Sequence, residues 1–152
     1  MRIPAGVADG QRIRLKGRGG PGRNGGPVGD LYVECRVTPD RIFGRDGDNL
    51  TVRVPITFAE AALGAVVEVP TLDGAAVKLR LKPGTQSGSR HRVRHKGVHT
   101  SRSRGSAQGD LIVTVDVQVP TDLTAEQRRA VESLAAATTG SPRDGLFNAA
   151  GR

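Results

Sequence analysis

One unit occurs twice in this chain, and this internal repeat constrains the fold more than any other feature of the sequence. Glycine and arginine recur at a constant offset, so that Gly6, Gly10, Arg12 and Arg14 correspond to Gly84, Gly88, Arg90 and Arg92. Farther along, Gly-Asp-Leu-Tyr-Val at 29–33 returns as Gly-Asp-Leu-Ile-Val at 109–113. Each copy therefore predicts a turn, a strand, a basic glycine-rich loop and a second strand that starts after Gly-Asp.

Alternation of apolar and polar residues indicates that most other elements are strands too. Apolar side chains recur at every second position in the runs 50–56, 66–69, 77–81 and 111–119, which is typical of strands with one buried face. Two segments carry a helix-start signal instead, a threonine followed three residues later by Glu or Gln. These are residues 57–64 and 124–137.

The two copies differ in what precedes them. Residues 48–82 supply a strand, the short helix and two further strands before the second copy, whereas only five residues precede Gly6. We therefore expect the chain to begin partway through its first domain.

The few sulfur and aromatic residues limit the kinds of site and core that the chain can form. Cys35 is the only cysteine, so an internal disulfide and a cysteine-only zinc site are excluded. With no Trp, one Tyr and three Phe, the core has to consist mainly of Val, Leu and Ile. No run approaches the ~18 apolar residues of a membrane span, and the N-terminus has no apolar signal segment. A cytoplasmic protein without membrane contact is expected.

Motifs that suggest catalysis or cofactor binding are weak. Residues 17–22 match G-x-G-x-x-G, but more Gly, Pro and Asn and then a strand follow where a dinucleotide site needs a helix. His91, His95 and His99 are four residues apart in a strand-and-turn context, which does not gather their rings as a helix face would. Neither a nucleophile elbow nor a carboxylate pair is present, so we expect no enzyme, no metal site and no cofactor in this chain.

The net charge of +8 keeps a basic nucleic-acid-binding module open as an alternative. Residues 75–109 contain many Lys and Arg and no Asp or Glu. They also contain no aromatic residue for base stacking, and alternate positions at 77, 79 and 81 look like core. The alternative that stays open is therefore nonspecific binding of nucleic acid.

Four blocks of the sequence resemble the DnaJ family of co-chaperones in their order and spacing. The blocks are residues 3–17, 26–33, 39–47 and 55–88. The resemblance implies an all-β fold with minor α, made of two tandem small β-sandwich-like domains, the first truncated, plus a C-terminal helix. It divides the chain into 1–47, the rear part of C-terminal domain I; 48–120, C-terminal domain II; 121–138, the helix; and 139–152, a flexible tail.

Other parts of that family have no counterpart among these 152 residues. The His-Pro-Asp tripeptide of the J domain, the Gly/Phe-rich linker and the repeated Cys-x-x-Cys-x-Gly-x-Gly units are not found. Class A members bind zinc through those cysteine units, upstream of a segment like residues 3–6, and class B members have none, so both classes stay open. The chain also departs from the family pattern at His91 and His95, whose first-copy counterparts Ile13 and Gly17 keep it.

The resemblance implies a co-chaperone fragment that binds unfolded or misfolded polypeptide and whose parent, acting in protein folding and the stress response, passes it to a DnaK-type chaperone through a J domain. An open strand edge beside a shallow apolar pocket would suit such a ligand. Phe43 is the first candidate for the pocket, with Ile42 and Ile13 beside it, although Phe43 could also be ordinary core.

The helix at 124–137 is the candidate for assembly. Val131 and Leu134 could form a homodimer contact, or pack back on the second domain. A module that only dimerises a longer chain is the third alternative.

Overall fold

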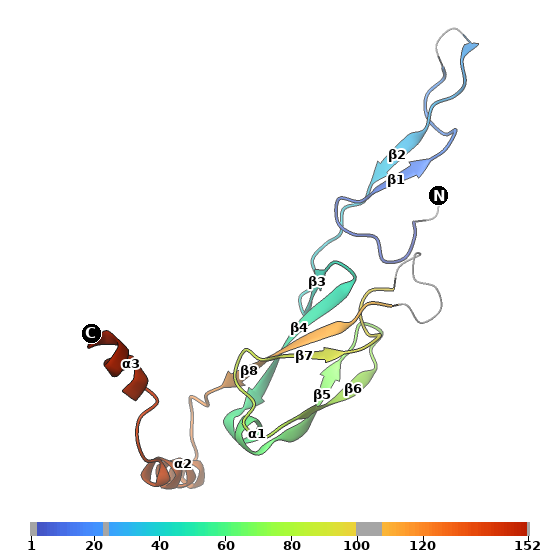
Figure 1. Cartoon of the computed structure of the whole chain (residues 1–152). Helices are drawn as coiled ribbons and strands as arrows, with labels where there is room; N and C mark the ends of the chain where they lie inside the picture. The colour runs from blue at the N-terminus through green and yellow to red at the C-terminus, as the bar shows by residue number, and fades with distance from the viewer. Residues whose placement is uncertain (1–2, 23–24, 100–107, 152) are drawn as a thin grey trace. The chain divides into compact units, whose positions relative to one another are not determined.

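The computed structural model describes residues 3–22, 25–99 and 108–151. Its strands are β1 (Arg12–Leu15), β2 (Leu31–Glu34), β3 (Phe43–Asp46), β4 (Asn49–Thr57), β5 (Ala65–Pro70), β6 (Ala76–Leu81), β7 (Arg90–Val93) and β8 (Leu111–Gln118), and its helices are α1 (Phe58–Leu63), α2 (Ala125–Ala137) and α3 (Asp144–Ala150). The chain divides into two compact units, Met1–Gln118 and Val119–Arg152. The first holds every described strand and α1, and the second holds α2 and α3 (Figure 1). The expected all-β fold with minor α is confirmed.

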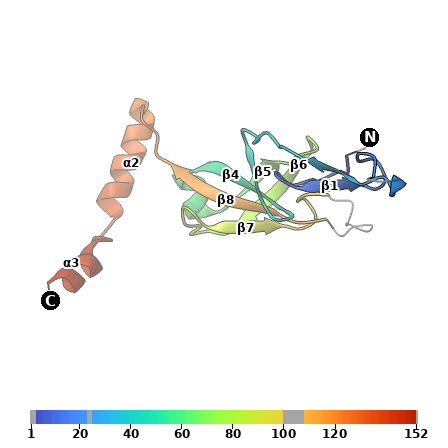
Figure 2. The ribbon, with the colours of Figure 1, turned by 90° about the horizontal axis from the view of Figure 1, so that it is seen from above.

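The strands form three sheets. β1 and β2 form a two-stranded antiparallel sheet, β5 and β6 form another, and the third has four strands in the order β3-β4-β8-β7. β4 and β8 lie side by side in both views (Figure 1, Figure 2) and run parallel, with Leu50 opposite Leu111. The other pairs in the four-stranded sheet are antiparallel.

The core lies on one face of the four-stranded sheet. Leu111, Val113 and Val115 of β8 are fully buried there, and Val69 of β5 and Leu81 of β6 pack into the same cluster. Full burial of such a side chain stabilises the fold by about 1.5–3 kcal/mol. The alternating pattern seen in the sequence thus marks the faces that two sheets bury against each other.

The internal repeat is confirmed in the hydrogen bonds. β1 pairs with β2 from Arg12 opposite Glu34 to Leu15 opposite Leu31, and β7 pairs with β8 in the corresponding register. Gly10 N–H donates to Cys35 O at 2.7 Å, and its counterpart Gly88 N–H donates to Val115 O at 2.8 Å. The β1–β2 and β7–β8 hairpins therefore share the same strand register and the same closing hydrogen bond.

An aspartate closes the loop of each hairpin. Asp30 Oδ1 accepts the Gly17 N–H at 2.9 Å, and Asp30 Oδ2 accepts Arg14 Nε at 2.6 Å. In the second copy, Asp110 accepts the His95 N–H at 3.1 Å and pairs with Arg92 at 2.9 Å. The backbone N–H, helped by the arginine, lowers the pKa of each aspartate. The repeated aspartates are thus turn residues.

The same turn forces an unusual backbone conformation on His95. Gly17 has φ of 73°, in the left-handed region that glycine adopts freely. His95 stands at the matching place with φ of 63°, and it is the only non-glycine with positive φ among the described residues. The second hairpin therefore carries backbone strain that the first does not.

The two hairpins differ in what covers them. β8 lies between β4 and β7, whereas β2 pairs only with β1 in the described part of the chain. Leu111 is accordingly 0% exposed, but its counterpart Leu31 is 43% exposed. The first hairpin thus has little core of its own within these residues.

Both predicted capping boxes are present. Thr57 Oγ1 accepts the Glu60 N–H ahead of α1, and Thr124 Oγ1 accepts the Gln127 N–H ahead of α2, each at 3.1 Å. No residue of α2 is buried. The segment 139–152, expected to be a flexible tail, contains α3, which the sequence did not predict because the segment is too short for an apolar periodicity.

Candidate functional site

A tight turn ahead of β3 presents the candidate binding residues. Asp40 Oδ1 accepts the N–H groups of Ile42 at 2.8 Å and Phe43 at 3.1 Å. These two bonds lower the pKa of Asp40 because they favour its charged form. The turn leaves Ile42 61% exposed at the start of the strand.

The three residues predicted to form the apolar pocket lie in two sheets. Phe43, the first residue of β3, is half-buried and packs against the core cluster, while Ile42 next to it faces solvent. Ile13 is half-buried on β1, opposite Val33. The structure therefore brings Ile42 and Phe43 together at one edge strand and assigns Ile13 to a different sheet.

Open strand edges accompany these residues. β3 and β7 are the outer strands of the four-stranded sheet, and β1 and β2 each have one side without a strand partner in the part that the structure describes. An unpaired edge offers backbone N–H and C=O groups that an extended peptide can join. Ile42 thus adjoins a strand that has no strand partner on its outer side among the described residues.

Further exposed apolar residues escaped the sequence reasoning. Tyr32 is 59% exposed on β2, and Leu31 and Val37 are also exposed. The comparison of the two copies points to this surface, because Leu31 matches the buried Leu111 but, among the described residues, has no strand beside it that corresponds to β4. An apolar surface on the first hairpin could have been predicted from that difference.

Arg45 links the first copy to the second. Its guanidinium donates to Gly6 O and Val7 O, both at 2.8 Å, and its Nε donates to Gly47 O at 2.7 Å. One side chain of β3 therefore holds the segment ahead of β1 against the β3–β4 turn. No sequence pattern predicts this contact beyond the presence of Arg45 in the block 39–47.

Part of the basic run is the solvated face of a strand, as expected. Lys78 and Arg80 of β6 are exposed, whereas Val77 and Leu79 pack against the core and Leu81 is buried. Arg102 and Arg104, which belong to the same run, lie outside the described residues.

Metal ligands and long apolar helices are the next features to consider among the described residues. Within them, no group of three His, Cys, Asp or Glu side chains could hold a metal ion, and no helix is long and apolar enough to cross a bilayer. His91 Nε2 instead lies 3.1 Å from Ser89 Oγ. The glycine loop at 17–22 leads into a hairpin, where Gly19 N–H donates to Gly29 O at 2.7 Å, and not into a helix.

Comparison with known proteins places these features in a family. The family model for the DnaJ C terminal domain matches residues 1–120. Chaperone protein DnaJ 1 of Streptomyces avermitilis is 56% identical over 151 residues, which are 99% of this chain and 37% of that protein. Chaperone protein DnaJ 2 of Cutibacterium acnes is 60% identical over 133 residues, 88% of this chain and 34% of that protein. Chaperone protein DnaJ 1 of Mycobacterium tuberculosis is 55% identical over 148 residues, 95% of this chain and 36% of that protein. The chain thus spans little more than a third of the length of these curated relatives.

Proposed function

Because this chain belongs to the DnaJ family through its C-terminal domain region, we propose that it binds non-native polypeptide as part of a co-chaperone. Binding, and not catalysis, is its role. The parent protein passes the bound chain to a DnaK-type chaperone in the cytoplasm. No cofactor takes part within these residues.

The exposed Ile42 beside the open edge of β3 is the observation that supports this function best. Unfolded chains expose apolar side chains and unpaired backbone groups, and an edge strand with an apolar neighbour can engage both. Backbone pairing does not read side chains, so such a site accepts many sequences. Phe43 stabilises the site because it packs against the core and so anchors the start of β3.

Substitution of Ile42 tests the proposal directly. We expect Ile42→Asp to weaken suppression of aggregation of a chemically denatured reporter enzyme several-fold, because a carboxylate replaces the exposed apolar contact. Phe58→Asp is the matched control, since Phe58 is 56% exposed at the start of α1, where an aspartate suits the helix N-terminus. Light scattering during dilution of the reporter measures the effect.

The comparison of Ile42→Asp with Phe58→Asp separates loss of a specific contact from a general effect of an added charge. Equal loss of activity in both variants, or none in Ile42→Asp, contradicts binding at β3. Circular dichroism of each variant establishes that the fold is kept before the comparison is made.

Delivery to a DnaK-type chaperone is proposed for the parent alone. The His-Pro-Asp tripeptide is not among these 152 residues, so the chain by itself is expected not to stimulate the ATPase of a DnaK-type chaperone. Stimulation at a stoichiometric amount of this chain would contradict that assignment.

We further propose the domain limits 1–47 for the rear part of C-terminal domain I, 48–120 for C-terminal domain II and 121–138 for a dimerisation helix. The matching hydrogen bonds of the two hairpins support one domain per copy. The half-exposed Val131 and Leu134 of α2 support a homodimer contact.

A further inference from the structure

The outer face of the four-stranded sheet, opposite the core, carries a polar cleft. Two adjoining hollows of about 240 and 350 Å³ share Thr51 and Arg90, and together they are called the outer cleft below. β4, β7 and β8 all contribute side chains to both hollows. The outer cleft is therefore a feature of the second copy.

The register of the strands places two arginines on either side of a threonine. Arg90 on β7 is opposite Thr114 on β8, and Thr114 is opposite Arg53 on β4. Neighbouring strands are about 4.8 Å apart, so the two arginine backbones lie on the order of 10 Å apart, within reach of a single bound group. Thr114, which also lines the cleft, lies between them on β8.

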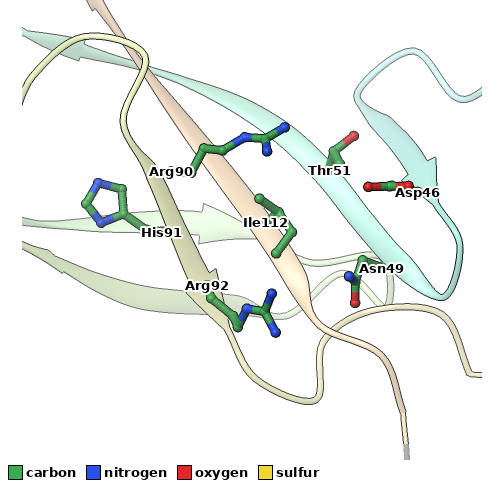
Figure 3. Close-up of a pocket in the computed structure, with 7 residues that line it drawn as sticks. All are labelled: Asp46, Asn49, Thr51, Arg90, His91, Arg92 and Ile112. Carbon is green, nitrogen blue, oxygen red and sulfur yellow. The ribbon is translucent and has the colours of Figure 1, made fainter.

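Arg92 adds a third guanidinium one row along. It is opposite Ile112, which in turn is opposite Thr51. Figure 3 shows the side chain of Arg90 reaching across β8 toward β4 and that of Arg92 pointing from β7 toward β8, on either side of Ile112. His91, on the same strand, points the other way (Figure 3).

The side chains that line the cleft include three arginines, Arg53, Arg90 and Arg92, and one carboxylate, Asp46. Arg92 pairs with Asp110 at 2.9 Å, and Arg53 only approaches Asp116 at 4.0 Å. For Arg90, no ion pair is found in the described ranges. Arg90 thus brings a guanidinium without an ion pair in those ranges, with five N–H donors in a fixed plane, to the part of the cleft that the two hollows share, although Asp46 lines one of them. A planar carboxylate is a ligand that such a group prefers.

We propose that the outer cleft is a docking surface for an extended acidic polypeptide segment, one carboxylate of which binds Arg90 and Arg53 beside Thr114. Ile42 and Ile112 line the cleft as well and would contact apolar neighbours of that carboxylate. This goes beyond the binding of non-native chains at a strand edge, because it requires a negative charge in the ligand and no open edge.

A polypeptide fits the cleft better than a nucleic acid does. Asp46 lines one hollow and Asp116 lies next to Arg53, so the cleft suits a single carboxylate between Arg53 and Arg90 and not the continuous row of negative charges of a nucleic acid. None of the described lining residues is Phe, Tyr or Trp, so bases would find no aromatic surface on which to stack.

Fluorescence anisotropy with a labelled, valine-rich peptide that contains a single Glu tests the proposal. Arg53→Gln with Arg90→Gln should weaken binding about tenfold at low ionic strength, as expected for two partly exposed charge contacts. Lys78→Gln with Arg80→Gln removes the same charge from the outer side of β6 and should change affinity less than about twofold, since charges farther apart than a Debye length of ~10 Å are screened. A peptide with Gln in place of Glu should bind poorly to the unchanged chain.

Two further measurements separate this cleft from general charge attraction. Thr114→Val keeps charge and volume and should weaken the acidic peptide several-fold, because it removes the Thr114 hydroxyl. Equal losses in the two double variants, no loss in Thr114→Val, or tighter Arg90-dependent binding of a single-stranded oligonucleotide would each overturn the proposal. Loss of the acidic peptide with suppression of reporter aggregation retained would support it and leave the strand-edge function standing.

Discussion

A single side chain, His95, differs from its repeat partner in a way that has an energetic cost. A left-handed backbone costs a residue other than glycine about 1–2 kcal/mol, and Gly17 adopts it without that cost. The hydrogen bond from His95 N–H to Asp110 keeps the backbone there in spite of the strain.

We therefore expect His95→Gly to raise the free energy of unfolding by about 0.5–1 kcal/mol. The gain is smaller than the strain because glycine loses more conformational freedom on folding. Gly17→His should lower stability by a comparable amount. The midpoint of urea unfolding measures both, and a lower midpoint for His95→Gly would show that its ring makes a stabilising contact.

At the same scale, Ile42 and Phe43 show how far sequence reasoning reaches into the site. The resemblance to the DnaJ family predicted both residues, but neighbours on a strand point to opposite faces, and the core lies on one face alone. That Phe43 would pack on the core and Ile42 would be exposed depends on the pairing of β3 with β4, which no local pattern encodes. Arg90 was not predicted as a site residue because its neighbours in the cleft, Arg53 and Thr114, come from strands that are distant in the sequence. Only the pairing of those strands brings the three residues together.

Among the elements, those with a local or repeated sequence signal were predicted. β3 and α3, which have neither signal, were not. β4, β6 and β8 carry alternation, and α1 and α2 carry capping boxes. The parallel pairing of β4 with β8 has no local signature, because it joins residues about sixty positions apart.

The helix α2 is the element whose partner can be tested. If its half-exposed apolar residues form the proposed homodimer contact, Val131→Asp should shift the chain from dimer to monomer, because a buried unpaired carboxylate is costly. Sedimentation velocity across a range of concentrations measures this. Glu132→Gln on the same helix is the control, and an unchanged dimer in Val131→Asp would exclude this face of α2 as the interface.

For the whole molecule, acid stability follows from the turn aspartates. Hydrogen bonds from backbone or side-chain donors lower the pKa of Asp30, Asp40, Asp73 and Asp110 in the folded chain. A lowered folded pKa contributes stability above the unfolded pKa of about 3.9 that is lost as the pH falls through the folded value. The free energy of unfolding should hold steady from pH 7 to about 5 and then fall.

Substitution checks this origin of acid sensitivity. Asp30→Asn with Asp110→Asn should make the decline below about pH 4 shallower, because two of the linked carboxylates are gone. Asp122→Asn, outside these turns, should leave the slope unchanged. Urea unfolding at a series of pH values gives both slopes, and parallel curves for all three proteins would rule the turns out as the cause.

The attachment of the first copy to the second can be tested through Arg45. Arg45→Ala removes the three bonds to Gly6, Val7 and Gly47 and should cost about 1–2 kcal/mol, discounted for partial exposure. Limited proteolysis should then cleave the region of β1 and β2 sooner, while the region of β4 to β8 resists as before. Arg41→Ala, at an exposed site nearby, is the control, and identical digestion of the two variants would mean that Arg45 does not hold the copies together.

The parallel pairing of β4 with β8 also has a consequence for the nascent chain. β4 leaves the ribosome about sixty residues ahead of β8, the strand with which it pairs. At roughly 5–20 residues per second, that interval lasts about 3–12 s. During those seconds β4 has an edge without its strand partner, which is the kind of segment that the proposed site would bind. Each new copy of the chain therefore passes through a stage in which it is itself a candidate client.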